Sequence, residues 1–213
     1  MQSKKSKNLK GVITIPGDKS ISHRSVILAS LALGQTVIKG LLKSDDVMKT
    51  IEVMRLFGAK INFKGNETCK INGVGVGGIL EPSQPLDFGN SGTSARLIMG
   101  VVATHPVSAI FTGDKSLSKR PMQRILEPLK LFGSDVSCRE DNYLPVIIKG
   151  SKLPIPISYK LELPSAQVKS AILLAGLNTP GTTEVIDKFN TRDHTERLLE
   201  IFGCSVDIKE TSQ

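Results

Sequence analysis

The phrase Leu56-Phe57-Gly58-Ala59 occurs twice more in closely similar form along the 213-residue chain, as Leu131-Phe132-Gly133-Ser134 and Ile201-Phe202-Gly203-Cys204. The glycines stand at positions 58, 133 and 203, so the phrase returns at nearly constant spacing. A period of this size indicates three copies of one supersecondary unit. Glycine directly after an amphipathic helix favours the left-handed conformation that ends the helix. We therefore expect a helix to end at each glycine.

The segments around each phrase follow one order in all three copies. An apolar helix comes first, followed by a short strand, the amphipathic helix that ends at the glycine, and another strand. The expected apolar helices cover residues 25–33, 93–103 and 167–177, and the strands after them cover residues 36–41, 109–112 and 183–186. The strands after the glycines cover residues 60–64, 135–139 and 205–209.

A closing strand is expected in the first copy at residues 69–73 and in the second at residues 144–149, but the sequence ends where the third copy would form it. The repeats therefore cover about residues 19–85, 86–150 and 151–213, the last one truncated. Because the apolar helices are hydrophobic nearly all round, we expect them to pack together inside sheets and outer helices. The predicted class is α/β (α+β), with three helix-strand-helix-strand-strand repeats around central apolar helices.

The starts of the amphipathic helices also resemble one another. Acidic capping residues open the first at Ser44-Asp45-Asp46, Pro121 lies in the first turn of the second, and Thr191-Arg192-Asp193 opens the third. Pro128 should kink or split the second helix, because proline lacks the backbone donor.

Composition excludes several classes of protein. No apolar run reaches the roughly eighteen residues of a membrane span, so we expect a cytoplasmic protein. The three cysteines and three histidines lack the spacing of a zinc site or disulfide framework, so no metal is expected. The net charge of +8 includes an N-terminal tail with four lysines, and without aromatic interleaving it gives little support for nucleic-acid binding.

Small polar residues stand at the start of each apolar helix: Lys19-Ser20-Ile21-Ser22, Asn90-Ser91-Gly92-Thr93 and Pro164-Ser165-Ala166-Gln167. The first group follows a short alternating strand at residues 12–15. Helix N-termini present unpaired amides, and their dipoles favour anions. If the three helices lie side by side, their starts surround one pocket that Arg24, Arg120 and Arg192 can reach. This pattern indicates a site for a polyanionic small molecule.

Simple capping is the alternative interpretation. Ser20 or Ser22, Asn90 and Ser165 would then be ordinary helix caps, and the basic residues would be solvated surface charges. Asp18 would be a charge partner of Lys19, and Asp45 and Asp46 would cap a helix.

Five motifs, in order, resemble the N-terminal half of the 5-enolpyruvylshikimate-3-phosphate synthase (3-phosphoshikimate 1-carboxyvinyltransferase) family. They are Gly17-Asp18-Lys19-Ser20-Ile21-Ser22-His23-Arg24, Gly89-Asn90-Ser91-Gly92-Thr93-Ser94-Ala95-Arg96, Lys119-Arg120-Pro121-Met122, Ser165-Ala166-Gln167-Val168-Lys169-Ser170 and Thr191-Arg192-Asp193-His194-Thr195-Glu196. The resemblance implies one of two similar three-repeat domains that close around the active site. Residues 1–18 would be a tail and a strand that joins the other domain.

The resemblance also implies the reaction and the residues that take part. The family transfers the enolpyruvyl group of phosphoenolpyruvate to the 5-hydroxyl of shikimate 3-phosphate in the shikimate pathway to chorismate and aromatic amino acids, releases phosphate, and needs no cofactor. Lys19 and Arg120 would be catalytic. The residues expected to contact shikimate 3-phosphate are Lys19, Ser20, Arg24, Ser165, Ala166, Gln167 and Arg192. Those expected to contact phosphoenolpyruvate are Lys19, Asn90, Gly92, Arg120 and Gln167.

Family members are about twice as long, and the other half carries the aspartate and glutamate that transfer protons. We therefore expect this chain to be an N-terminal half that is inactive without its C-terminal partner. The alternative is a degenerate, non-catalytic fragment that only binds shikimate 3-phosphate or other phosphoanions.

Overall fold

The computed structural model describes residues 4–5, 8, 10–65, 68–140 and 142–209. The α-helices are α1 (Lys19–Leu31), α2 (Asp45–Leu56), α3 (Gly92–Ala103), α4 (Gln123–Leu131), α5 (Ala166–Gly176) and α6 (His194–Ile201), and η1 (Leu117–Lys119) is a 3₁₀ turn. The strands are β1 (Gln35–Lys39), β2 (Lys60–Lys64), β3 (Thr68–Asn72), β4 (Leu86–Asp87), β5 (Ser108–Thr112), β6 (Asp135–Arg139), β7 (Tyr143–Lys149), β8 (Ser158–Lys160) and β9 (Glu184–Ile186).

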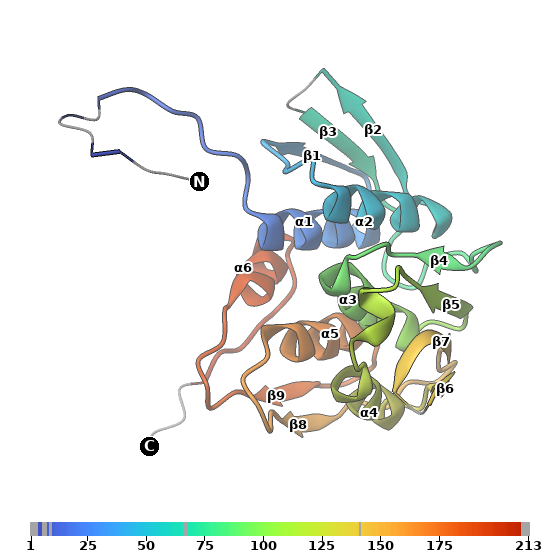
Figure 1. The fold of residues 1–213 in the computed structure, drawn as a ribbon. Coiled ribbons are helices and arrows are strands. Elements are labelled where there is room, and N and C mark those ends of the chain that lie inside the picture. The colour runs from blue at the N-terminus through green and yellow to red at the C-terminus, as the bar shows by residue number, and fades with distance from the viewer. Residues whose placement is uncertain (1–3, 6–7, 9, 66–67, 141, 210–213) are drawn as a thin grey trace.

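The elements follow the repeat expected from the sequence (Figure 1). The first copy is α1-β1-α2-β2-β3, and the second repeats this order from α3 to β7. The glycines that end α2, α4 and α6 have φ angles of 101° at Gly58, 92° at Gly133 and 83° at Gly203. All three lie in the left-handed region, so the prediction that they end helices is confirmed.

The closing strand lies in the middle of each of the two larger sheets. β3 pairs antiparallel with both β1 and β2, and β7 pairs antiparallel with both β5 and β6. A further short strand, β4, pairs parallel with β5 at the edge of the second sheet. The strands that follow the amphipathic helices, β2 and β6, are therefore edge strands whose one neighbour is the closing strand.

The predicted strand at residues 205–209 is wrong, because residues 204–209 are irregular. In the third copy, β8 and β9 form a two-stranded parallel sheet. Within the described residues nothing takes the place of β3 or β7 there, so residues 205–209 have no strand to pair with. A strand needs such a partner for its backbone donors and acceptors.

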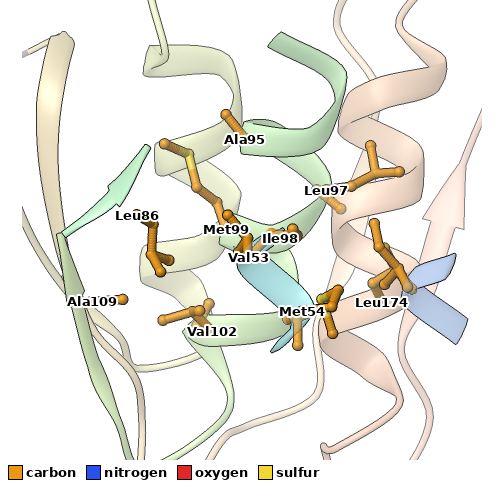
Figure 2. Close-up of a cluster of buried hydrophobic side chains, with 14 of the residues drawn as sticks. Val53, Met54, Leu86, Ala95, Leu97, Ile98, Met99, Val102, Ala109 and Leu174 are labelled. Atoms are coloured by element: carbon orange, nitrogen blue, oxygen red, sulfur yellow. The ribbon is translucent and has the colours of Figure 1, made fainter. Parts of the chain in front are cut away.

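The core is built around α3 (Figure 2). Leu86 and Ala109 lie on one side of this helix and Leu174 of α5 on the other, and all three side chains are buried. α3 packs tightly against α5, since a Cβ at Gly100 would lie 2.2 Å from the Ala171 carbonyl oxygen. α1 packs mainly on α2 and α6. The three apolar helices therefore lie in the interior as expected, but they do not pack equally on one another.

The start of the chain differs from expectation in two ways. α1 begins at Lys19 rather than at residue 25, because His23 and Arg24 in its first turns are buried and have hydrogen-bond partners on α2, α5 and α6. Residues 12–15 form no strand, and Val12 and Ile13 are fully or largely exposed. The described residues before α1 extend away from the body of the molecule in Figure 1. Part of the expected tail, including Lys7, lies outside the described residues.

The ends and interior of the other helices need smaller corrections. α4 runs through Pro128 without a break, and Pro121 lies before its N-cap rather than in its first turn. α6 begins at His194, after Asp193. None of the helices in the described part of the chain is long and apolar enough to cross a bilayer.

Candidate anion-binding site

The roles expected for Asp18 and Asp46 are reversed in the structure: the sequence interpretation made Asp18 the charge partner of Lys19 and Asp46 a helix cap. Asp18 is the N-cap of α1, because its Oδ1 accepts a hydrogen bond of 2.7 Å from the Ile21 amide. The ion-pair partner of the Lys19 ammonium group is Asp46, in the first turn of α2. Neither Ser20 nor Ser22 caps α1. Lys19 is half-exposed and so remains at the surface of the helix start.

Arg24 is a buried cation that the structure holds with hydroxyl groups. Its Nε donates to Thr195 Oγ1 at 2.7 Å, its Nη2 to Ser170 Oγ at 2.6 Å and its Nη1 to Ser20 Oγ at 2.7 Å. Only 3% of the residue is exposed, and it forms no ion pair with any described acid. Burial, and then the charge of Arg192, lower the pKa of Arg24 to about 10. No described carboxylate contacts the guanidinium, and the more distant charges of Glu196 and Asp18 do not offset the effect of burial on its pKa.

Ser20 links α1 to the start of α6. Its hydroxyl accepts from Arg24 and lies 3.0 Å from the Nδ1 atom of His194. Arg192, two residues before His194, is exposed near Arg24. The sequence did not identify Ser170, Thr195 or His194 as part of this cluster. Their position inside the motifs that carry the family resemblance was the available signal.

A second group of cations surrounds the start of α3. Arg120 Nη2 donates to Asn90 Oδ1 at 2.6 Å and to Ser116 Oγ at 3.1 Å. Gly92, the first residue of α3, is buried beneath two guanidinium groups. A Cβ there would lie 2.8 Å from Nη1 of Arg96 and 3.3 Å from Nη1 of Arg120. Glycine at this position lets both arginines approach the helix start.

Arg96 is a site residue that the sequence interpretation missed. Its Nη1 donates to Gln167 Oε1 at 3.1 Å, and its Nη2 contacts the Pro121 carbonyl at 3.4 Å. Burial lowers the pKa of Arg96, and the nearby charges of Arg120 and Arg124 lower it further. Arg96 is the one charged residue in the apolar helix α3, and this pattern could have identified it.

The first turns of α5 join the two groups. Ser165 is the N-cap and accepts from the Val168 amide at 3.3 Å, and Ala166 is the first helical residue. Gln167 donates to Thr93 Oγ1 of α3 at 3.0 Å and accepts from Arg96, while Ser170, one turn later, contacts Arg24. The starts of α1, α3 and α5 therefore form one connected polar cluster.

This cluster is suited to an anion with more than one charge. It combines three helix starts, whose dipoles favour negative charge, with five basic side chains. These are Lys19, Arg24, Arg96, Arg120 and Arg192. No group of three or more His, Cys, Asp or Glu side chains in the described residues is arranged to hold a metal ion.

Comparisons with known proteins identify the family of the chain. The sequence profile of the family described as EPSP synthase (3-phosphoshikimate 1-carboxyvinyltransferase) matches residues 3–213. The chain belongs to this family. It is 54% identical over 202 residues to a 3-phosphoshikimate 1-carboxyvinyltransferase of Parvibaculum lavamentivorans, which covers 95% of this chain and 45% of that protein. A protein of the same name from Paracoccus denitrificans is 52% identical over 213 residues, covering 100% of this chain and 48% of the relative.

Solved structures of the family have the same fold. The EPSP synthase from Acinetobacter baumannii superposes with a TM-score of 0.90 at 44% sequence identity, over 93% of this chain and 45% of that one. The chain thus spans about half the length of the relatives it matches, and its fold corresponds to half of their two-domain fold.

Proposed function

We propose that this chain holds shikimate 3-phosphate for the transfer of an enolpyruvyl group from phosphoenolpyruvate to the 5-hydroxyl of that substrate. The observation that carries this proposal is Arg24, a buried cation without a carboxylate partner among the described residues, at the meeting point of α1, α5 and α6. A phosphorylated ligand beside Arg24 and Arg192 would supply the missing negative charge. The names of the relatives, 3-phosphoshikimate 1-carboxyvinyltransferases, support this choice of ligand.

The proposed contacts follow the two groups of cations. Shikimate 3-phosphate lies against Ser20 and Arg24 on α1 and against the start of α5, with Arg192 as a second cation. The α5 contacts are Ser165, the Ala166 backbone and Gln167. Phosphoenolpyruvate lies by Asn90, Gly92 and Arg120, also in reach of Gln167. Lys19 stands between the two substrates, where its ammonium offsets their mutual repulsion.

The chain's own contribution to the reaction is positioning and charge compensation. Holding two anions together replaces an improbable encounter with a fixed geometry. The 5-hydroxyl must lose a proton and the methylene carbon of phosphoenolpyruvate must gain one, which requires an acid and a base at those atoms. The carboxylates nearest Lys19 are occupied, since Asp18 caps α1 and Asp46 pairs with Lys19. We therefore assign proton transfer to residues that correspond to the other half of the relatives.

Calorimetry with shikimate 3-phosphate tests the binding site. We expect the chain to bind this ligand and to bind phosphoenolpyruvate alone far more weakly. Arg192→Ala should weaken the affinity for shikimate 3-phosphate at least tenfold, or about 1.4 kcal/mol. Arg197→Ala is the matched control, because Arg197 is an exposed arginine of the same segment that pairs with Asp193. Equal effects of both substitutions, or none from either, would contradict the proposed site.

A phosphate-release assay with both substrates tests whether the chain needs the other half for turnover. The chain alone should release no phosphate, and adding the other half of the Paracoccus denitrificans relative as a separate polypeptide should restore release. Turnover by the chain alone would show that it contains its own acid and base. A chain that binds shikimate 3-phosphate but never gains activity would support the alternative of a non-catalytic binding protein.

A further inference from the structure

Lys169 is a buried lysine at the centre of a polar network behind the site. Its Nζ donates to three acceptors: Glu196 Oε1 at 2.7 Å, Asp187 Oδ2 at 3.0 Å and the Thr191 carbonyl at 3.0 Å. The side chains of all three charged residues are about 8–11% exposed. An ammonium group has three hydrogens, so its donor capacity is fully used.

Asp187 folds the loop that leads to Arg192. Its Oδ1 accepts from the Phe189 amide at 2.9 Å, and its Oδ2 accepts from the amide and the hydroxyl of Thr191 at 3.0 and 2.6 Å. Hydrogen bonds from Thr191 and Lys169 outweigh the opposing effect of burial and lower the pKa of Asp187 to about 2. The carboxylate is therefore ionised at any pH near neutrality, and the loop between β9 and α6 is fixed on both sides of residue 190.

Lys169 also belongs to the start of α5. Its amide donates to the carbonyl of the N-cap Ser165, and it stands two residues after Gln167. One side chain thus connects the helix start with the loop that ends at Arg192. Both elements carry groups assigned above to shikimate 3-phosphate.

We infer that Lys169 is a positioning residue that holds the start of α5 and the Arg192 loop in one fixed arrangement around the phosphate group. This inference rests on the proposed function, because it concerns the geometry of the same site. A buried ionic network seldom stabilises a fold more than apolar residues of similar volume would. The network instead fixes the orientation of the loop and of α6 relative to α5. Each hydrogen of the ammonium group points to an acceptor on a different part of the loop or on α6. Lys169 itself does not touch the ligand.

The experiment uses two variants and one control. Lys169→Met removes the connection, and Thr191→Val removes only the hydroxyl donor to Asp187 and leaves no buried charge unpaired, so it remains informative if the first variant does not fold. Arg55→Met is the control, because Arg55 also joins two elements by donating to a backbone carbonyl, that of Ile61, but in the first repeat. For each protein, calorimetry measures the affinity for shikimate 3-phosphate, and hydrogen exchange follows the amides of Phe189 and Thr191.

We expect Lys169→Met to weaken the affinity at least tenfold and Thr191→Val about threefold or more, with faster exchange at the Phe189 and Thr191 amides in both. Arg55→Met should lower the melting temperature without changing the affinity or those amides. Unchanged exchange in both variants, or an equal loss of affinity in the control, would overturn the role of Lys169. If the wild-type chain does not bind shikimate 3-phosphate, the proposed function fails. The exchange data would then decide separately whether Lys169 orders the loop.

Discussion

All three repeats contain an apolar helix and an amphipathic helix, but the sheets of the first two repeats differ from that of the third. In the first two, the closing strands β3 and β7 lie between their neighbours, and β2 and β6 form at the edge. In the third repeat, residues 204–209 are irregular, although they follow the equivalent helix α6 and the equivalent glycine, Gly203. An edge strand in this fold therefore depends on the closing strand more than on its own sequence, as expected where strand propensity reflects context.

The closing strand also holds the end of the apolar helix. A glycine follows it directly in both complete repeats, Gly73 after β3 and Gly150 after β7. A Cβ would lie 2.2 Å from the Ala32 carbonyl oxygen in the first case and 2.0 Å from the His105 carbonyl oxygen in the second. The chain after the closing strand thus packs directly on the backbone at the C-terminal end of α1 or α3.

The phenylalanine of the repeated phrase gives the largest expected difference between the two kinds of repeat. Phe132 is fully buried in the second repeat, whereas Phe202 is only partly buried in the third. Phe132→Ala should lower the free energy of unfolding by about 3–5 kcal/mol, the usual cost of emptying a filled core site. Phe202→Ala should cost clearly less. Urea denaturation of both variants measures this, and equal losses would show that the third repeat is packed as well as the second.

Alanine at the glycines should give the next largest effect. Gly150→Ala places a methyl group against backbone atoms that cannot move aside, and we expect a loss of about 2–3 kcal/mol. At Gly203 a Cβ would meet nothing within 4 Å, so Gly203→Ala costs only the strain of its φ of 83°, about 1 kcal/mol. The same denaturation experiment ranks the two. A larger loss for Gly203→Ala than for Gly150→Ala would mean that the close packing of Gly150 on the His105 carbonyl does not limit the residue at position 150.

The dependence of stability on pH should be the smallest effect and should arise in the complete repeats. Burial lowers the pKa of His23 on α1 to about 4 and also lowers that of His105 after α3. Because the unfolded chain binds protons near pH 6.5 and the folded chain does not, stability is full above that pH and falls as the pH drops toward 4. From pH 7 to pH 5.5 we expect His23 alone to cost about 1 kcal/mol.

Replacing His23 tests this dependence directly. His23→Asn keeps a hydrogen-bonding group toward Thr50, whose hydroxyl lies 2.7 Å from the His23 Nδ1 atom. In the variant, most of the change in unfolding free energy between pH 7 and pH 5.5 should be absent. Asp187 does not contribute to that change, because its pKa is about 2 in the folded chain and ordinarily 3.8. If the unfolding free energy of the variant falls equally between pH 7 and pH 5.5, groups other than His23 cause the pH dependence.

Local signals in the sequence predicted much of this fold. The three glycines require a backbone conformation that few other residues adopt, so they marked the helix ends reliably. β2 and β6 have the bounds predicted from the local alternation of apolar and polar residues. The similar pattern at residues 205–209 gives no strand, because a strand also needs a pairing partner that local sequence does not reveal. The start of α1 was not predictable in this way. His23 and Arg24 are typical of a surface turn, and they are helical and buried because distant residues of α2, α5 and α6 supply their partners.

The candidate site was predicted in composition but not in its connections. The residue types at the helix starts indicated an anion, and the family resemblance proposed the role of each residue. The sequence could not indicate that Asp46 rather than Asp18 pairs with Lys19, since that choice depends on how α2 lies across α1. It also missed Arg96 and the network of Lys169, whose partners lie on other elements.

The close contact between α3 and α5 has a consequence for synthesis on the ribosome. α3 belongs to the second repeat, but the side that carries Leu97 and Gly100 is covered by α5 of the third (Figure 2). A chain that emerges N-terminus first has all the strands of its second sheet before this side of α3 is covered. The nascent second repeat therefore exposes an apolar helix surface until α5 appears, and chaperones recognise such surfaces. The three similar repeats are consequently not three independent folding units.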